Sequence, residues 1–107
     1  MADKMKIDGF DWDIGNLVKC QKHGVGIAEI EALFRSGNVL ILPDLAHSLD
    51  EERLKAVGRT SSGRVIFLGF TLRSRDGLRL ARPITARYMH RKEIDDYEKT
   101  IPRPDDR

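Results

Sequence analysis

The sequence has little of several features that would mark a secreted, membrane or disulfide-stabilised protein. Cys20 is the single cysteine among 107 residues, which excludes an intramolecular disulfide and favours a reducing compartment. No apolar run approaches the roughly 20 residues of a membrane span, and the N-terminal segment lacks the apolar stretch of a secretory signal. We therefore expect a cytoplasmic protein with no membrane partner. The length favours one domain over residues 1–107, with a core of about 7–99 and a loose tail at 100–107.

Motifs that bind metals or cofactors are also scarce. The sequence has no glycine-rich phosphate loop. Cys20 and His23 have a spacing that could hold a metal ion, but His47 and His90 add no further ligand spacing. Ser48 is a poor nucleophile candidate, because its nearest imidazole belongs to the adjacent residue. We expect neither a metal nor a cofactor.

Charge is what the sequence does have, and it is unevenly distributed. Residues 1–58 carry seven Lys and Arg against ten Asp and Glu, whereas residues 59–92 carry nine against one. Residues 93–107 carry three Lys and Arg against six Asp and Glu. A block of net charge +8 thus lies between two blocks of −3 each, and such a block can attract a polyanion.

Hydrophobic periodicity predicts helices in the first third of the chain and strands after it. The stripe of Ile27, Ile30, Leu33 and Phe34 has helical spacing, and Gly26 with Glu29 has half the spacing of a capping box. The expected N-terminal elements are a short strand or extended segment (7–13), helices (15–23, 26–38), a strand (39–43) and a helical turn beginning at Ser48.

The remaining elements are mostly strands joined by hairpin turns. Pro83 cannot donate to a strand ladder, so it implies a bulge or an edge position. The expected elements are strands (53–58, 64–73, 78–87), turns (59–64, 74–77) and a helix (90–99). The order β-α-α-β-β-β-β-α predicts an α+β domain with an antiparallel or mixed sheet of four to five strands, two N-terminal helices and one C-terminal helix.

Arginines at the ends of these strands have two interpretations. Alternation places Arg73 and Arg64 on opposite faces of their strand, and likewise Arg87 and Arg82. In one interpretation these side chains are solvated or paired with acids, namely Glu29, Glu52 and Glu93. In the other, the sheet surface binds phosphates, because guanidinium groups match phosphate oxygens in pairs. Aromatic residues outside the core are few apart from Tyr88, so base stacking would be sparse.

The stretch "GNLVKCQKHGV" (15–25) crowds three cationic or titratable side chains. On a helix, Lys19, Lys22 and His23 are three and four residues apart and share a face. They are either a solvated helix end, where cations complement the dipole, or a surface that receives an anion.

Taken in order, several segments resemble the BrnT family of bacterial toxins. They are "FDWD", "GNxxKCxKHGV", "EIEALF", "HSxxEER", "GR", "FTLR" and "RPITARYMHRKEIDDYE", which extend from about Phe10 to Glu98. The chain departs from the family pattern in having Gly26 where many members have serine, and in the early position of Asn16.

The resemblance implies a RelE-like ribonuclease fold and a toxin of a type II toxin–antitoxin pair. It implies an RNA substrate and a BrnA-type antitoxin as partner. Because the antitoxin of that family carries the DNA-binding part, this chain would reach operator DNA only through the antitoxin.

RNA contains its own nucleophile, so a toxin of this kind can cleave it without a metal. A base removes the 2′-OH proton, and charge on the phosphoryl oxygens is stabilised. The resemblance and the charge pattern together give the candidate catalytic residues His23, Glu52, Arg64, Arg73 and Arg87, and the candidate RNA-binding residues Lys19, Lys22, Arg53 and Arg82.

Within these sets, the arginines would stabilise charge, and His23 or Glu52 would transfer protons. The alternative is a non-catalytic basic module, or an inactive toxin relic, that binds nucleic acid or a partner with the same residues.

Overall fold

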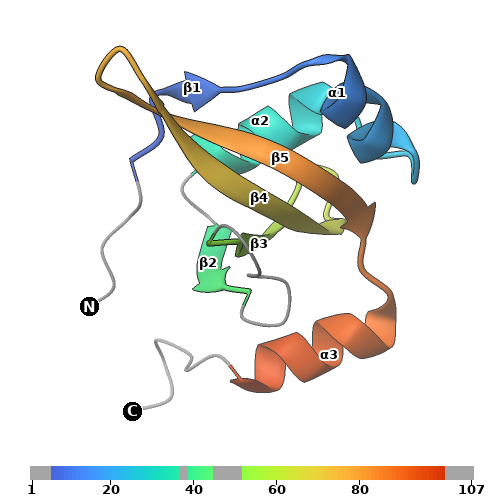
Figure 1. Ribbon diagram of the computed structural model, residues 1–107. Coiled ribbons are helices and arrows are strands. Elements are labelled where there is room, and N and C mark those ends of the chain that lie inside the picture. Colours follow the sequence, from blue (N-terminus) through green and yellow to red (C-terminus); the bar gives the residue numbers. More distant parts are fainter. Residues whose placement is uncertain (1–5, 37–38, 45–51, 101–107) are drawn as a thin grey trace.

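A computed structural model describes residues 6–36, 39–44 and 52–100 of the chain. Its elements follow the expected order. They are β1 (Gly9–Phe10), α1 (Ile14–Gln21), α2 (Ile27–Ser36), β2 (Val39–Pro43), β3 (Leu54–Arg59), β4 (Val65–Arg75), β5 (Leu78–Tyr88) and α3 (Arg91–Thr100). The expected α+β class with two N-terminal helices and one C-terminal helix is confirmed (Figure 1).

The five strands form one mixed sheet with the order β1-β5-β4-β3-β2. β1 is parallel to β5, and the other neighbours are antiparallel. Of the short strand or extended segment expected at 7–13, only Gly9 and Phe10 pair with the sheet. The chain leaves the sheet after Phe10 because Asp13 then begins α1. The expected helical turn after Ser48 falls mostly on 45–51, outside the described residues.

Local signals explain where the elements begin and end. Asp13 caps α1 through a capping box with Asn16, whose side chain bonds back to the Asp13 N–H. Glu29 accepts from the Gly26 N–H, which confirms the half capping box predicted for α2. The β4–β5 hairpin turns through Asp76 and Gly77, both with positive φ, as a type I′ turn requires.

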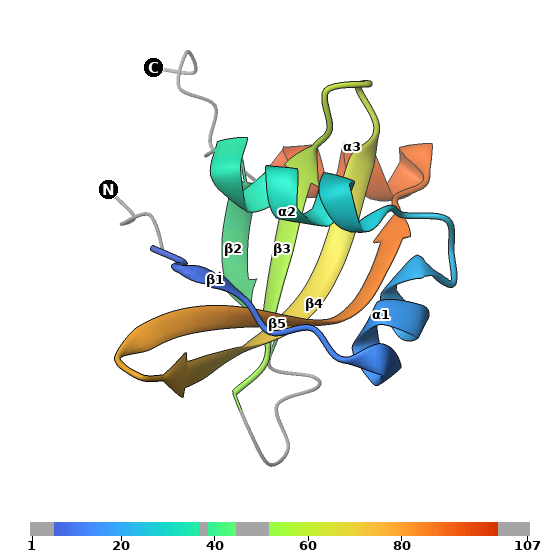
Figure 2. The ribbon, with the colours of Figure 1, turned by 90° about the horizontal axis from the view of Figure 1, so that it is seen from above.

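α2 covers one face of the sheet, and α3 lies on the opposite side, as Figures 1 and 2 show. The main core fills the space under α2. Its aromatic centre is an edge-to-face series of Phe10, Phe34 and Phe70. The buried side chains packed with it include Ile30, Leu33, Ile66 and Leu68. This core fixes which face of each strand points away from α2, and therefore where the arginines lie.

The predicted irregularity at Pro83 is a β-bulge. Gly69 pairs with Thr85, whereas the next residue of β4, Phe70, pairs with Pro83. Ile84 is thus the extra residue of β5, and side-chain alternation shifts by one position across it. This shift has a direct effect on the arginines of β5.

No helix among the described residues has the length and apolarity needed to cross a membrane.

Candidate functional site

Arginines gather on the sheet face that points away from α2. Arg87 pairs with Phe67, and Arg82 pairs with Thr71, so both point to the same side as the odd-numbered residues of β4, Arg73 among them. The expectation that Arg82 and Arg87 lie on opposite faces is wrong, because it ignored the bulge between them. We call Arg53, Arg73, Arg82 and Arg87 the arginine row.

Arg53 joins the row because Gly69 leaves room for it. A Cβ atom on Gly69 would lie 2.7 Å from the Arg53 Nη2 and 3.1 Å from a methyl carbon of Thr85. The Arg53 side chain therefore lies across the middle of the sheet, and only glycine at position 69 permits this. Arg53 also forms an ion pair with Asp44 at 3.8 Å.

Arginines of the arginine row form ion pairs with acidic side chains. Arg82 pairs with Asp13 at 2.7 Å and with Asp11 at 3.6 Å. The hydrogen bond that Arg82 donates to Asp13 raises the pKa of Arg82. The hydrogen bonds that Asp13 accepts from the Asn16 backbone N–H and from Arg82 lower the pKa of Asp13. Arg82 is thus paired with acids, as the first interpretation expects, but its partners are Asp11 and Asp13 and not Glu29, Glu52 or Glu93.

Arg87 forms the pair that lies nearest to α3. Its guanidinium is 2.8 Å from Glu93 and lies 4.9 Å from the centroid of the Phe67 ring. Glu93 also accepts from the His90 N–H. These two hydrogen bonds, the one from Arg87 first, lower the pKa of Glu93 to about 2.

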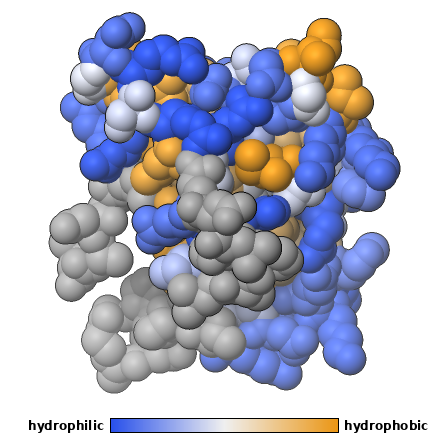
Figure 3. Space-filling model, viewed as in Figure 1, coloured by the Kyte–Doolittle hydropathy of each residue, from blue (hydrophilic) through white to orange (hydrophobic). Residues whose placement is uncertain are grey.

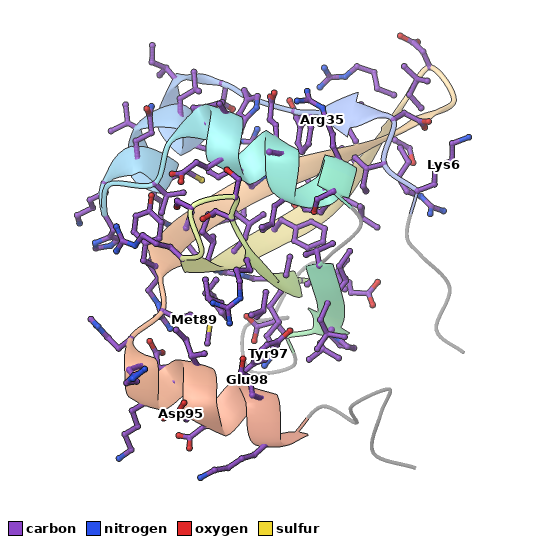
Figure 4. The ribbon with its side chains drawn as sticks, turned by 180° about the vertical axis from the view of Figure 1, so that it is seen from behind. Lys6, Arg35, Met89, Asp95, Tyr97 and Glu98 are labelled. Carbon is purple, nitrogen blue, oxygen red and sulfur yellow. The ribbon has the colours of Figure 1, made fainter. Side chains whose placement is uncertain are left out.

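α3 adds a second ion pair on the same side of the sheet, between Glu98 and Arg59 at 3.3 Å. Figure 4 shows Tyr97 and Glu98 pointing from α3 toward the sheet and Asp95 pointing away. Two acids of α3, Glu93 and Glu98, therefore face arginines of the central basic block in the folded chain, as their opposite charges favour.

A different arrangement occurs at the end of the sheet where β4 begins and β5 ends. The Tyr88 hydroxyl donates to a carboxylate oxygen of Glu29 on α2 at 2.5 Å. The Arg64 guanidinium carbon lies 3.5 Å from the centroid of the Tyr88 ring. Arg64 has no acidic partner among the described residues, unlike the three arginines of the row whose ion pairs are given above. We call Glu29, Arg64 and Tyr88 the Tyr88 cluster.

Electrostatics in the Tyr88 cluster favour a protonated hydroxyl beside a carboxylate. The hydrogen bond to Glu29, together with burial and the Glu29 charge, raises the pKa of Tyr88, and Arg64 opposes this shift. Glu29 Oε1 accepts from both Tyr88 and the Gly26 N–H. Its Oε2 makes no hydrogen bond with the described residues and can accept a proton from a ligand.

A groove of about 610 Å³ opens beside the Tyr88 cluster. It is lined by Glu29, Ala32, Leu33 and Ser36 of α2, by Arg59 at the end of β3, and by Thr60 and Ser61 of the β3–β4 turn. The groove therefore extends from Glu29 on α2 to the hydroxyl-bearing residues Thr60 and Ser61.

The other sequence-predicted residues divide between these regions. The connection between α1 and α2, which contains Lys22 and His23, lies at the end of the sheet where β5 ends (Figures 1 and 2). Both side chains are exposed, as is Lys19 on α1. Glu52 is exposed just before β3 and adjoins Arg53, away from the Tyr88 cluster.

The predicted catalytic residues do not form one compact hollow. Arg64 lies over Tyr88, on the α2 side of the sheet, and Arg87 lies on the opposite face. Arg73 is six residues along β4 from Phe67, the partner of Arg87, which corresponds to roughly 20 Å. One site can therefore contain Arg64 and the α1–α2 connection, and another can contain the arginine row. No single site brings both groups within bonding distance of one bound phosphate.

Sequence reasoning missed the pairing of Glu29 with Tyr88. From the sequence, Glu29 is expected to be a helix cap or a partner for arginines, and Tyr88 is expected to be an aromatic residue outside the core. They are 59 positions apart, and no spacing rule connects them. The one signal was Tyr88 itself, an aromatic residue outside the core within the basic block.

Asn16 has a structural role. It is buried, and its side-chain amide donates to the carbonyl oxygens of Asp11 and Pro83 at 3.0 and 2.8 Å. Its oxygen accepts from the Asp13 N–H. Asn16 thus connects α1 to β5 at the bulge and fixes where the α1–α2 connection lies.

No group of three or more His, Cys, Asp or Glu side chains with the geometry of a metal site occurs in the described part of the chain. Cys20 is buried in the core beneath α1, where burial raises its pKa to about 11.

An α+β domain with a cationic sheet face and a tyrosine–carboxylate pair beside an arginine is suited to a phosphate-containing substrate. The model of one protein family, described as "Ribonuclease toxin, BrnT, of type II toxin-antitoxin system", matches residues 12–93. The chain therefore belongs to the BrnT family of ribonuclease toxins. No curated protein matches the chain. Membership implies an RNA substrate and an antitoxin as partner.

Proposed function

We propose that this protein cleaves RNA without a metal ion, by attack of a ribose 2′-oxygen on the adjacent phosphorus, at the Tyr88 cluster. The observation that carries the proposal is the juxtaposition of Arg64, which has no acidic partner among the described residues, with the Tyr88–Glu29 hydrogen bond. The groove beside Glu29 offers room for a nucleotide.

The reaction balances with groups from this chain. The Glu29 carboxylate takes the proton of the 2′-OH through Oε2, and the 2′-oxygen forms a bond to phosphorus. The bond from phosphorus to the 5′-oxygen breaks, and the leaving oxygen receives a proton from the imidazolium of His23, which acts as the general acid. The products are a 2′,3′-cyclic phosphate and a 5′-hydroxyl.

Arg64 stabilises the charge that grows on the phosphoryl oxygens. A guanidinium stays protonated at neutral pH and donates two parallel hydrogen bonds, which suits it to this role and not to proton transfer. Tyr88 orients both partners, because its hydroxyl holds Oε1 of Glu29 and its ring supports Arg64.

The arginine row and the exposed lysines Lys19 and Lys22 bind the RNA backbone on either side of the cleaved bond. Exposed ion pairs contribute little to stability, so a phosphate can replace Glu93 or Asp13 at moderate cost. This would bring the arginines into the RNA-binding surface without a direct part in bond cleavage.

In the cell, we propose a RelE-like messenger RNA ribonuclease that acts in the cytoplasm and stops translation and growth. A BrnA-type antitoxin would neutralise it and would carry the pair to operator DNA.

The test is cleavage of a defined RNA by the purified protein in excess chelator, with analysis of the product ends. We expect cleavage with 2′,3′-cyclic phosphate ends, and a loss of about 10²–10⁴-fold in rate for Glu29→Gln. Glu52→Gln is the matched control, since Glu52 is the other carboxylate that the sequence offers as a base.

Three results would contradict the proposal. Cleavage that requires an added divalent metal would exclude the metal-independent mechanism. Loss of activity in Glu52→Gln but not in Glu29→Gln would move the base to the arginine row. RNA binding without any product would support the non-catalytic module.

A further inference from the structure

The outer face of α1 carries the most exposed apolar side chains in the described part of the chain. Ile14 is 81% exposed and Val18 is 67% exposed. They are four residues apart, so they lie one above the other on the helix surface. Figure 3 shows this as apolar surface at the upper right, over α1.

This exposure follows from how α1 packs. Asn16 and Cys20 are its buried residues, so the line through positions 14, 18 and 22 points directly away from the sheet. The same line therefore ends on Lys22 at the C-cap of α1, with Lys19 beside it, and His23 is the next residue of the chain. An apolar half and a cationic half occupy one continuous face. Two neighbouring aliphatic side chains on an outer helix face have no role in the core, and together with the adjacent cations they are a candidate interaction surface.

We propose that this face, Ile14, Val18 and Lys22, binds the antitoxin through a segment that offers apolar side chains to the first two residues and carboxylates to Lys19 and Lys22. Family membership implies that an antitoxin binds this chain. Only the effect of that binding on catalysis rests on the proposed function. The proposal adds the surface that the partner occupies and the chemistry of the segment that binds there.

The chemistry of the face favours a protein over RNA. Ile14 and Val18 are aliphatic and cannot stack with bases, whereas RNA-binding surfaces use aromatic side chains beside cations. A protein segment with apolar and acidic side chains complements both halves at once.

The face also favours the antitoxin over a second copy of this chain. An antiparallel second copy would bring the start of its α1, with Asp13, to Lys22. Both carboxylate oxygens of Asp13 are already engaged, Oδ1 by the Asn16 N–H and Oδ2 by Arg82. A second copy therefore offers no uncommitted acid from this segment.

Binding here would also silence the toxin. The C-terminal end of α1 leads into the connection that carries His23 to the end of the sheet where β5 ends (Figure 2). A carboxylate bound to Lys22 would occupy the approach that an RNA phosphate needs, and the partner's bulk would cover the connection.

The experiment measures binding of the purified antitoxin, encoded by the adjacent gene, to toxin variants by calorimetry in the absence of RNA. We expect Val18→Asp to weaken binding by roughly 30-fold or more, as for loss of a central interface contact. Lys22→Glu should weaken binding and remove part of its salt dependence.

Leu78→Asp is the matched control, because Leu78 is half-exposed at the β4–β5 turn, at the other end of the molecule (Figure 1). It should bind the antitoxin like the parent protein. Circular dichroism of each variant, with unchanged unfolding midpoints, establishes that the fold is retained.

Other outcomes would overturn the proposal. Antitoxin affinity within twofold of the parent in Val18→Asp would exclude this face. A change in self-association of the free toxin, seen by sedimentation, with antitoxin affinity unchanged, would assign the face to a second copy. A loss of RNA binding, measured by fluorescence anisotropy, with antitoxin affinity unchanged would assign it to RNA. Because antitoxin binding is measured without RNA, a toxin with no ribonuclease activity would still test this surface.

Discussion

The arginine row and the Tyr88 cluster contain the same kind of cation in opposite settings. In the row, Arg53, Arg82 and Arg87 each have a carboxylate partner, at 2.7–3.8 Å. In the Tyr88 cluster, Arg64 lies on an aromatic ring, and the nearby carboxylate of Glu29 bonds to the Tyr88 hydroxyl. An arginine that is paired with a carboxylate stabilises the fold, or binds a backbone phosphate that replaces that carboxylate. An arginine without an acidic partner, such as Arg64, can stabilise negative charge that develops during the reaction.

The two regions also differ in how they are built. The row lies on a regular antiparallel ladder and depends on strand alternation, one bulge and the space above Gly69. The Tyr88 cluster joins a helix start, a turn and a strand end. Functional side chains commonly lie on such connecting segments, which a rigid scaffold positions.

The largest expected difference between the regions is in catalysis. Arg64→Ala should lower kcat for RNA cleavage by about 10²–10³-fold, as for removal of one donor that stabilises developing charge. Arg73→Ala is the matched control from the row. It should leave the single-turnover rate unchanged and should weaken RNA binding, with the salt dependence of affinity reduced by roughly one phosphate contact.

Rapid-quench cleavage and equilibrium binding at several salt concentrations measure both quantities. If Arg73→Ala lowers the single-turnover rate as much as Arg64→Ala does, the assignment of catalysis to the Tyr88 cluster alone is wrong.

The next largest effect is on stability, through the attachment of α1 to the sheet. This attachment positions the α1–α2 connection near the Tyr88 cluster. Asn16→Ala should lower the free energy of unfolding by about 2–3 kcal/mol, because it removes a cap and leaves the buried Pro83 carbonyl without its donor. Gln21→Ala, which removes an exposed bond to the Leu17 carbonyl, should change it by less than about 0.5 kcal/mol. Urea unfolding measures both variants, and equal effects would show that the Asn16 bonds do not hold α1.

The smallest effect concerns the pairing of Arg87 with Glu93. The pKa of Glu93 is lowered to about 2 from 4.5, so the pair contributes stability that is fully present above pH 4.5 and is lost as the pH falls toward 2. The contribution is on the order of 1 kcal/mol or less, because the pair is partly exposed. Glu93→Gln should therefore be less stable than the parent at pH 7, and the difference should shrink between pH 4.5 and 2.

Asp95→Asn serves as the control, since Asp95 points away from the sheet (Figure 4). Urea unfolding across this pH range measures the effect. A difference between Glu93→Gln and the parent that is constant with pH would mean that the Arg87–Glu93 pair contributes nothing to stability.

Much of the fold was predictable because its signals are local. The spacing of Ile27, Ile30 and Leu33 predicts α2, and the Asp-Gly turn predicts the β4–β5 hairpin. The bulge at Pro83 follows from the missing N–H of proline. The face of Arg82 was predicted wrongly, because the effect of one extra residue on alternation depends on pairing with β4, which the sequence of β5 does not contain.

The candidate site was predictable only in part. The basic block located the arginines, but their partners come from distant segments. Asp13 reaches Arg82 across 69 positions, and Tyr88 reaches Glu29 across 59. Contacts between residues so far apart in the chain are set by packing of the sheet against α1 and α2, and no periodicity encodes them.

By itself, the sequence determined the element order, the amphipathic helices, the segregation of charge into blocks and the membership in a ribonuclease toxin family, because each depends on neighbouring residues or on motifs in order. Only the tertiary structure decided which arginines are neutralised and which one lies beside a tyrosine and a carboxylate. The physical reason is that charge pairing acts over a few ångströms in space, and the chain brings those groups together only after the core has fixed the faces of its strands.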